Sequence, residues 1–292
     1  MKKYPIYEVG SFKCNAESGE FYVNTFHNHL QTHPFVEEPH RHSSYLLVFF
    51  TQGSGTHEID FDTFEIHPGS FFVLQPGQIH NWNLSDDIDG FIVIYAQEVY
   101  NLYFGQKNIA DYPFYQLTSN KPKWQLNADQ QKQILPYFKS MIAENGNQNK
   151  YSMDKMLNLL DCIHIEIARK YAVSEIHATH SYNVKIKQFE TQIEKYFRHE
   201  KLPSFYASKL SITLKHLNRI SNEILGKTAT EVVINRVILE AKRMLSDKNL
   251  SVNEVAEALG YDDYSYFARV FKKQTGLSPT AFRTPKNNNT IF

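Results

Sequence analysis

The apolar residues of this chain follow one pattern in its first part and another in its second. Between residues 21 and 99 they come in short runs rich in aromatic and β-branched side chains, of which residues 45–50, 71–74 and 91–95 are the strongest. Turn residues such as Gly53, Ser54 and Gly55 separate these runs. Short runs at this spacing, with no helical periodicity between them, predict a β-sandwich or a small β-barrel.

Beyond residue 121 the pattern changes to that of helices. Residues 128–143 predict a helix that Pro136 interrupts, and a second helix carries an apolar stripe at steps of three and four residues. The stripe consists of Met153, Met156, Leu157, Leu160, Ile163, His164 and Ile167. Either it is the seam of a dimer or it packs on the outer face of the chain's own barrel, because both produce the same pattern.

The last part of the chain predicts a helix-turn-helix motif. Ser251 and Glu254 have the spacing of a capping box, and Gly260 is expected to end the short helix that they begin. The next helix turns Phe267 and Phe271 inward and leaves polar and basic side chains outside. This arrangement is typical of a motif that reads DNA.

A first copy of the same motif precedes it. Thr213 is a suitable N-cap for a helix over residues 214–225, which Gly226 closes. Between the copies, residues 230–245 predict a connecting helix of roughly 24 Å. We therefore expect the two reading helices, the second helix of each motif, to stand about 34 Å apart and to enter successive major grooves.

Charge divides the chain in the same way. Residues 1–182 carry 13 Lys and Arg against 20 Asp and Glu, whereas residues 183–292 carry 18 against 11. An acidic half joined to a basic half indicates a nucleic-acid module tied to another domain. The only cysteines, Cys14 and Cys162, give neither a disulfide framework nor a cysteine zinc site, and no apolar run is long enough to span a membrane. These features predict a soluble cytoplasmic protein.

The β-rich region contains a histidine pattern. His40 and His42 precede the first strong strand, and a Pro76-Gly77 turn leads to His80 and Trp82. Over residues 35–95 this pattern resembles the signature of a cupin barrel. In metal cupins the histidine pair, a following Glu and the distal His bind the ion, and here His40, His42 and His80 match, but residues 43–47 contain no Glu.

Two alternatives follow for this site. Three imidazoles can hold zinc or iron, but the missing carboxylate favours a pocket without a metal or cofactor. If the strands turn His40, His42, Tyr45, His80 and Trp82 inward, these residues line a small-molecule pocket with aromatic walls. Trp82 can equally fill the core of the barrel.

The helical half resembles the DNA-binding domain of the AraC/XylS family of transcriptional regulators over residues 184–285. The matching residues are Arg236, Ala241, Leu245, Ala256, Gly260, Tyr261, Tyr266, Phe267, Arg269, Phe271, Lys272, Lys273, Gly276, Ser278, Pro279, Phe282 and Arg283. A cupin domain ahead of this module is a common layout in the family, so the two resemblances support each other.

By position, the family resemblance implies which side chains meet DNA. Lys215, Asn218 and Arg219 of the first motif and Tyr264, Ser265 and Arg269 of the second would read bases. Lys272, Lys273 and Arg283 would contact phosphates. One position departs from the pattern: Ser221 stands where the second copy has Phe271, which implies a weaker anchor under the first reading helix.

We therefore expect a multidomain protein with an N-terminal cupin-like β-barrel, flanking helices and a C-terminal all-α domain. The expected boundaries are a barrel over residues 1–120, a helical and candidate dimerisation segment over 121–171, a linker over 172–182 and a tandem helix-turn-helix domain over 183–292.

The expected function is that of a ligand-responsive transcriptional regulator and not of an enzyme. Its expected partners are double-stranded DNA, a small-molecule effector, a second copy of the chain and RNA polymerase. One alternative is a metal-dependent cupin enzyme fused to a DNA-binding module, and another is a regulator whose barrel serves only in assembly.

Overall fold

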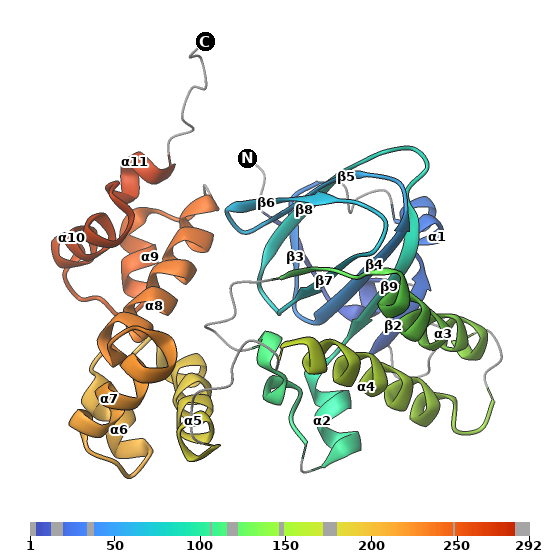
Figure 1. Cartoon of the computed structure of the whole chain (residues 1–292). Helices are drawn as coiled ribbons and strands as arrows, with labels where there is room; N and C mark the ends of the chain where they lie inside the picture. Colours follow the sequence, from blue (N-terminus) through green and yellow to red (C-terminus); the bar gives the residue numbers. More distant parts are fainter. Residues whose placement is uncertain are drawn as a thin grey trace. The chain divides into compact units, whose positions relative to one another are not determined.

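The chain folds into two units, one rich in strands and one made of helices (Figure 1). The computed structural model describes residues 4–12, 20–33, 38–105, 107–115, 122–145, 149–171, 180–247 and 249–283. The described residues up to Tyr171 form the first unit, and those from His180 onward form the second. No helix in these ranges is both long enough and apolar enough to cross a membrane.

Two five-stranded sheets form the first unit. The first sheet has the order β1 (Ile6–Tyr7), β3 (His40–His42), β8 (Ile79–Leu84), β5 (Gly55–Ile59) and β6 (Asp62–Ile66). The second has the order β10 (Lys123–Gln125), β7 (Ser70–Leu74), β4 (Tyr45–Gln52), β9 (Asp89–Tyr95) and β2 (Phe21–Thr25). The strands predicted from the apolar runs are therefore confirmed, and they belong to the second sheet.

The core between the sheets contains alternate residues of β4. Leu46, Val48 and Phe50 pack inward with residues of the first sheet such as Ile59 and Trp82. The other residues of the strand, Tyr45 among them, point to the opposite face, because successive side chains of a strand alternate. Both faces of β4 are thus buried, which explains why its sequence is continuously apolar.

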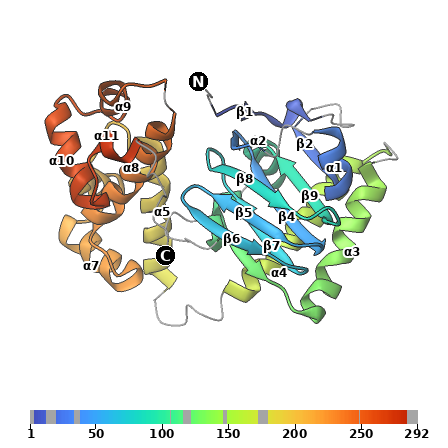
Figure 2. The same cartoon turned by 90° about the horizontal axis from the view of Figure 1, so that it is seen from above.

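Helices cover the outer face of the second sheet, as Figures 1 and 2 both show for α3 and α4. The helices of this unit are α1 (Phe26–Thr32), α2 (Gln97–Phe104), α3 (Ala128–Asn145) and α4 (Ser152–Tyr171), together with short 3-10 helices at Val9–Ser11, Ile109–Asp111 and Pro113–Tyr115. Helix α1 lies within the region that we predicted to hold only strands, and that prediction is wrong at this point.

The two long helices differ from expectation in one respect and resolve one alternative. Pro136 lies inside a continuous α3 instead of interrupting it, because Ile134 and Phe138 are fully buried on either side of it and hold both segments against the sheet. On α4, Leu160 and Ile163 of the predicted stripe are fully buried against this same outer face. The stripe therefore packs on the chain's own barrel, the second of its two interpretations.

A buried polar layer joins α4 to the sheet. The His164 Nε2 atom lies 3.0 Å from the Tyr95 hydroxyl and 3.1 Å from the Tyr115 hydroxyl. One turn earlier, the Asp161 carboxylate accepts hydrogen bonds from the Tyr112 hydroxyl and from the Lys107 ammonium at 2.5 and 2.6 Å. These contacts give polar partners to groups that the helices would otherwise bury unpaired.

All regular secondary structure in the described part of the second unit is helical. The helices are α5 (His180–Tyr196), α6 (Pro203–Lys209), α7 (Leu214–Leu225), α8 (Ala229–Ser246), α9 (Val252–Ala258), α10 (Tyr264–Thr275) and α11 (Pro279–Arg283). Helix α5 begins at His180, inside the predicted linker, and residues 172–179 of that linker lie outside the described residues.

The two helix-turn-helix motifs are α6 with α7 and α9 with α10. Thr213 caps α7, Asp263 caps α10, and Ser251 forms the predicted capping box with Glu254. In the turn of the second motif Gly260 has a φ of 68°, and a Cβ there would lie 2.3 Å from the Arg198 carbonyl oxygen, so the position requires glycine.

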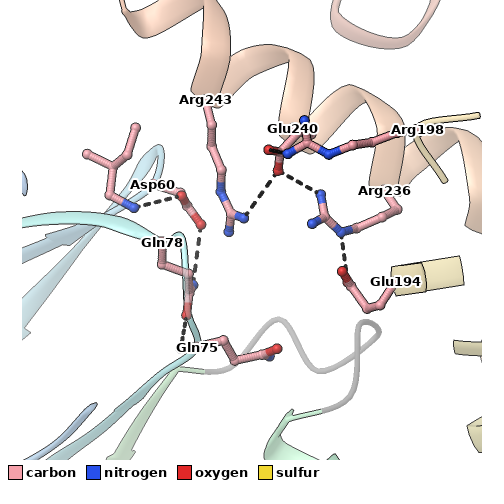
Figure 3. Close-up of polar contacts among 9 residues, drawn as sticks. Asp60, Gln75, Gln78, Glu194, Arg198, Arg236, Glu240 and Arg243 are labelled. Atoms are coloured by element: carbon pink, nitrogen blue, oxygen red, sulfur yellow. Dashed lines mark hydrogen bonds and ion pairs between the residues drawn. The ribbon is translucent and has the colours of Figure 1, made fainter. Parts of the chain in front are cut away.

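Helix α8 connects the motifs and packs against α6, α7, α9, α10 and α11. The residues of its core-facing side are fully buried: Ala229, Val233, Val237, Ala241 and Leu245. Its polar side contacts α5 and the residues that follow it (Figure 3). There Glu240 accepts from Arg198 at 2.7 Å and from Arg236 at 3.1 Å, while Arg236 also pairs with Glu194 at 2.7 Å. The connecting helix is therefore held on both sides.

Candidate ligand site and DNA-reading surface

Four histidines gather on the inner face of the first sheet, and we call His40, His42, His57 and His80 the histidine cluster. His40 and His42 lie at alternate positions of β3, and His40 is directly opposite His80 of β8. On the other side of β8, His57 of β5 is opposite Trp82. All four histidines are buried, with exposed fractions between 0% and 4%.

Hydrogen bonds fix the orientation of these rings. The His40 Nδ1 atom lies 2.7 Å from the Glu38 carbonyl oxygen, and its Nε2 atom lies 3.1 Å from His42 Nε2. The His57 Nε2 atom lies 3.1 Å from His80 Nδ1. His80 Nε2, His42 Nδ1 and His57 Nδ1 are buried and have no hydrogen-bond partner in the described protein.

Burial keeps the cluster uncharged. It lowers the pKa of the His40 imidazole, although the hydrogen bond to Glu38 acts in the opposite direction. Burial lowers the pKa of His42, His57 and His80 further still, and positive charge on neighbouring histidines adds to that effect. The rings are thus neutral imidazoles at neutral pH.

The sequence prediction brought together only part of this site. His40, His42, His80 and Trp82 do face the interior, but Tyr45 does not. Its ring stacks on Tyr95 at 5.7 Å on the helix-covered face. The prediction that Tyr45 points into the barrel is therefore wrong, because a strand buried on both faces gives no alternation from which to assign its direction.

Trp82 takes part in both the core and the histidine cluster. It is 4% exposed, its ring meets Phe26 at 5.3 Å, and it lies 4.8 Å from the His80 ring. Its indole Nε1 atom is buried and has no partner among the described residues. The alternative prediction that Trp82 fills the core is thus confirmed. Its indole N–H also remains as a hydrogen-bond donor beside the histidine cluster.

Three histidines of this region escaped the sequence reasoning. His57 is missing from it because it stands alone in a short strand, although its position two residues before the buried Ile59 places it on the same face. His29 and His33 are spaced four apart around the end of α1, the helix that was not predicted. Burial and positive charge on His33 and His40 lower the pKa of His29 to about 3.

The donor set fits a metal ion. One ligand atom from each of His40, His42 and His80 can be chosen so that all lie within 4.8 Å of one another. Neutral imidazole nitrogen is a ligand for zinc, copper, nickel and iron. Among the described residues this set contains three histidines and no carboxylate, which distinguishes it from the set of metal cupins.

The reading helix of the first motif, α7, presents polar side chains from its first turns. Lys215 and Arg219 are exposed, and Arg219 Nη2 lies 3.2 Å from His216 Nδ1. Asn218 is half-buried, and its side-chain oxygen accepts a hydrogen bond of 3.0 Å from the Ala229 N–H at the start of α8. Pairing with adenine needs both the oxygen and the nitrogen of an Asn amide, so this contact competes with base reading.

The reading helix of the second motif, α10, is more exposed. Tyr264, Ser265 and Arg269 all reach solvent, and the Arg269 guanidinium lies 6.0 Å from the centre of the Tyr266 ring. Lys272 and Lys273 are exposed in its last turn. Arg283, in contrast, is half-buried on α11. The basic side chains near the end of α10 thus differ in their access to a partner.

The anchors beneath the two reading helices also differ. Phe271 is fully buried and meets Phe267 at 5.9 Å and Phe282 at 5.5 Å. Ser221, at the matching position, is equally buried, and its hydroxyl donates to the Lys227 carbonyl oxygen at 2.7 Å. The first motif therefore has a polar anchor where the second has an aromatic one.

Two helix-turn-helix motifs on a shared connecting helix, preceded by a β-rich unit with a buried polar cluster, define a DNA-binding transcriptional regulator with a separate ligand-binding domain. Residues 206–285 match the family described as a helix-turn-helix domain, and residues 20–160 match the family described as an AraC-like ligand binding domain. The chain belongs to the AraC family of transcriptional regulators.

The chain is also similar to several individual proteins. The arabinose operon regulatory protein of Salmonella typhimurium is 24% identical over 254 residues, which cover 85% of this chain and 86% of that protein. The transcriptional activator RhaS of Pectobacterium carotovorum is 21% identical over 250 residues, covering 84% and 86%. Among solved structures, ToxT from Vibrio cholerae aligns over 90% of this chain and 95% of its own, at 13% identity and a TM-score of 0.44.

Proposed function

We propose that this protein binds specific double-stranded DNA through α7 and α10, and that a small molecule bound inside the barrel controls this binding. The observation that carries the proposal is the pair of exposed reading helices attached to one buried connecting helix. Such a pair can enter two successive major grooves from one face of the duplex. Lys215 and Arg219 would read bases in one groove, and Tyr264, Ser265 and Arg269 in the next.

Asn218 is assigned a narrower role than the sequence implied. Since its oxygen already accepts from Ala229, the side chain keeps both amide N–H donors and only one of its two acceptor positions for DNA. Lys272 and Lys273 are proposed to contact phosphates, because they are exposed at the end of α10 away from its first turn. Arg283 is retained as a proposed phosphate contact, although its Nε and Nη2 atoms are buried and have no hydrogen-bond partner among the described residues.

Selection of the preferred DNA from a random library, followed by footprinting, tests the DNA-binding role. Arg269→Ala is expected to weaken binding by about 1 to 3 kcal/mol and to relax preference at one base position. Lys273→Ala should instead weaken binding to all sequences and reduce the salt slope by about 1. Lys132→Ala changes an exposed lysine of α3 and should leave both unchanged. An unaltered footprint with Arg269→Ala would remove that residue from the reading surface.

Control by an effector follows from differential binding. A ligand shifts the DNA-binding equilibrium only as far as its affinities for the two states of the protein differ. Screening sugars and other small metabolites for a rise in the thermal midpoint identifies the ligand, because a molecule that binds only the native state stabilises it. The shift should disappear with His42→Ala and persist with His67→Ala, an exposed histidine. If both variants respond alike, the ligand binds elsewhere.

The remaining parts of the proposal concern assembly and context. We propose a homodimer whose subunit contact avoids the stripe of α4, since that stripe is used within the chain; Leu102 of α2, 83% exposed, is a candidate for it. Because its relatives are transcriptional regulators, we infer that the protein acts in the cytoplasm, meets RNA polymerase at its promoters and catalyses no reaction.

A further inference from the structure

The tautomer of His40 can be assigned from one of its hydrogen bonds. A carbonyl oxygen only accepts, so the contact of 2.7 Å between His40 Nδ1 and the Glu38 oxygen requires a proton on Nδ1. A neutral ring then carries its lone pair on Nε2. That atom faces His42 Nε2 at 3.1 Å, so two ring nitrogens converge on one point in the buried interior.

The ring of His80, the third histidine, is oriented by its contact with His57, the fourth. If His80 Nδ1 donates to His57 Nε2 across 3.1 Å, the lone pair of His80 lies on Nε2. His80 Nε2 is buried and has no partner among the described residues, and the His40 and His80 ring centres lie 4.3 Å apart. A buried nitrogen without a partner costs about 1 to 3 kcal/mol, so the arrangement calls for a group that accepts its lone pair.

A metal ion meets this requirement better than another hydrogen-bond donor. A ligand nitrogen lies about 2.0 to 2.1 Å from zinc, which puts neighbouring ligands of one ion little more than 3 Å apart. The spacing of 3.1 Å between His40 and His42 is of this size. Because the three donors are imidazoles, the site suits zinc, cobalt, nickel or copper and not magnesium or calcium, which take oxygen ligands.

We propose that His40, His42 and His80 bind one divalent transition-metal ion of the zinc class, and that His57 is a positioning residue that holds His80 in the coordinating tautomer. The proposal rests on the proposed role of the barrel as the effector domain. Three protein ligands leave a coordination position open. The effector is accordingly the metal ion itself or a small molecule that donates an oxygen or nitrogen atom to it.

Titration of the untagged full-length protein with cobalt(II), after removal of metals by a chelator, tests the site directly. We expect one ion per chain, with the visible absorption of four- or five-coordinate cobalt, and displacement by zinc. His80→Ala should weaken binding by at least tenfold, whereas the exposed His67→Ala should not change it. Absence of binding, or equal binding by folded His80→Ala protein, would overturn the proposal.

The role of His57 is tested by a pair of variants. His57→Gln keeps a side-chain oxygen that can accept from His80 Nδ1, whereas His57→Leu keeps the volume without an acceptor. We expect His57→Leu to weaken metal binding by about 10- to 100-fold and His57→Gln to restore most of it. The thermal midpoints of His57→Leu and His57→Gln, measured with chelator present, should be similar. A purely structural role of His57 would instead lower both the stability and the metal affinity of the two variants.

A DNA-binding measurement with and without zinc separates this inference from the proposed function. Metal bound at the cluster with a matching change in operator affinity supports both. Metal bound at the cluster without any such change supports the site and contradicts control by the metal ion alone. Specific DNA binding by a protein that takes up no cobalt leaves the regulator intact and removes the metal site.

Discussion

The side-chain oxygen of Asn218 accepts a hydrogen bond of 3.0 Å from the backbone N–H of Ala229. This contact joins the reading helix of the first motif to the first residue of the connecting helix. The N–H groups in the first turn of a helix have no partner within the helix, so Asn218 supplies one of the missing acceptors. A residue expected only to read DNA therefore also positions α7 against α8.

Two substitutions of Asn218 separate these roles. Asn218→Ala should lower the free energy of unfolding by about 1 kcal/mol and weaken binding to all operator sequences alike. Asn218→Asp keeps the acceptor and adds a favourable charge at a helix N-terminus, so it should remain stable while it loses the amide donor. Urea denaturation and binding to operators with single base changes provide the measurements. A loss confined to one A·T position in a fully stable Asn218→Ala protein would show that base reading dominates.

The anchors under the two reading helices give a second prediction. Phe271→Ala should destabilise the protein by about 3 to 5 kcal/mol, because it leaves a cavity among Phe267 and Phe282. Ser221→Ala removes the hydrogen bond to the Lys227 carbonyl and should cost about 0.5 to 1.5 kcal/mol. Chemical denaturation monitors both variants. If Ser221→Ala is neutral, the hydroxyl is not an anchor.

The packing of α4 predicts where its apolar stripe acts. Leu160→Ala should destabilise the barrel unit by about 2 to 5 kcal/mol at any protein concentration, since the side chain is fully buried within the chain. Arg169→Ala, on the exposed side of the same helix, should change stability by less than about 0.5 kcal/mol. Unfolding at two protein concentrations, together with sedimentation, distinguishes packing within the chain from a dimer interface. If the stripe formed a dimer interface, Leu160→Ala would cause the dimer to dissociate.

His164 predicts a dependence of stability on pH. Burial is the main cause that lowers its pKa to about 3, from an ordinary value of about 6.5. Because the unfolded ring takes up a proton below pH 6.5 and the folded ring does not until about pH 3, this residue makes the protein less stable as the pH falls between these values. The slope approaches about 1.4 kcal/mol for each pH unit.

The variant His164→Gln tests this dependence, since a Gln amide can still meet the hydroxyls of Tyr95 and Tyr115. The wild type should be the more stable protein at pH 7, and its advantage should shrink as the pH is lowered to 5. Urea midpoints at constant ionic strength, with a chelator present, give the comparison, and His67→Gln serves as the exposed control. Parallel curves for the two proteins would contradict the buried neutral state of His164.

Local signals in the sequence were enough to predict much of the fold. Capping at Thr213 and Ser251, and the left-handed residue Gly226, set the limits of short helices through interactions between near neighbours, and the structure has these limits where we expected them. The strand over residues 45–50 was clear for the same reason. Its direction was not, because a strand covered on both faces has no polar side that identifies the outside.

The candidate ligand site depended more on contacts between distant residues. The resemblance to the cupin signature implied that His40, His42 and His80 meet, but nothing near His57 in the sequence links it to them. It comes beside His80 only through the pairing of β5 with β8. The hydrogen bond from Ala229 to Asn218 was likewise beyond prediction, since it depends on the angle at which α8 leaves α7. Both contacts depend on tertiary structure, which the local sequence pattern does not determine.

The burial of the connecting helix α8 restricts which operator sequences this protein can recognise in a genome. Since α8 is enclosed by α6, α7, α9, α10 and α11, the separation and relative rotation of the two reading helices are properties of the fold and not of the DNA. One additional base pair between the two recognised segments turns them by about 34° relative to each other. Operators should therefore vary in individual bases far more readily than in the number of bases between their two segments. A genome search for these operators should permit base substitutions but no insertions or deletions between the two segments.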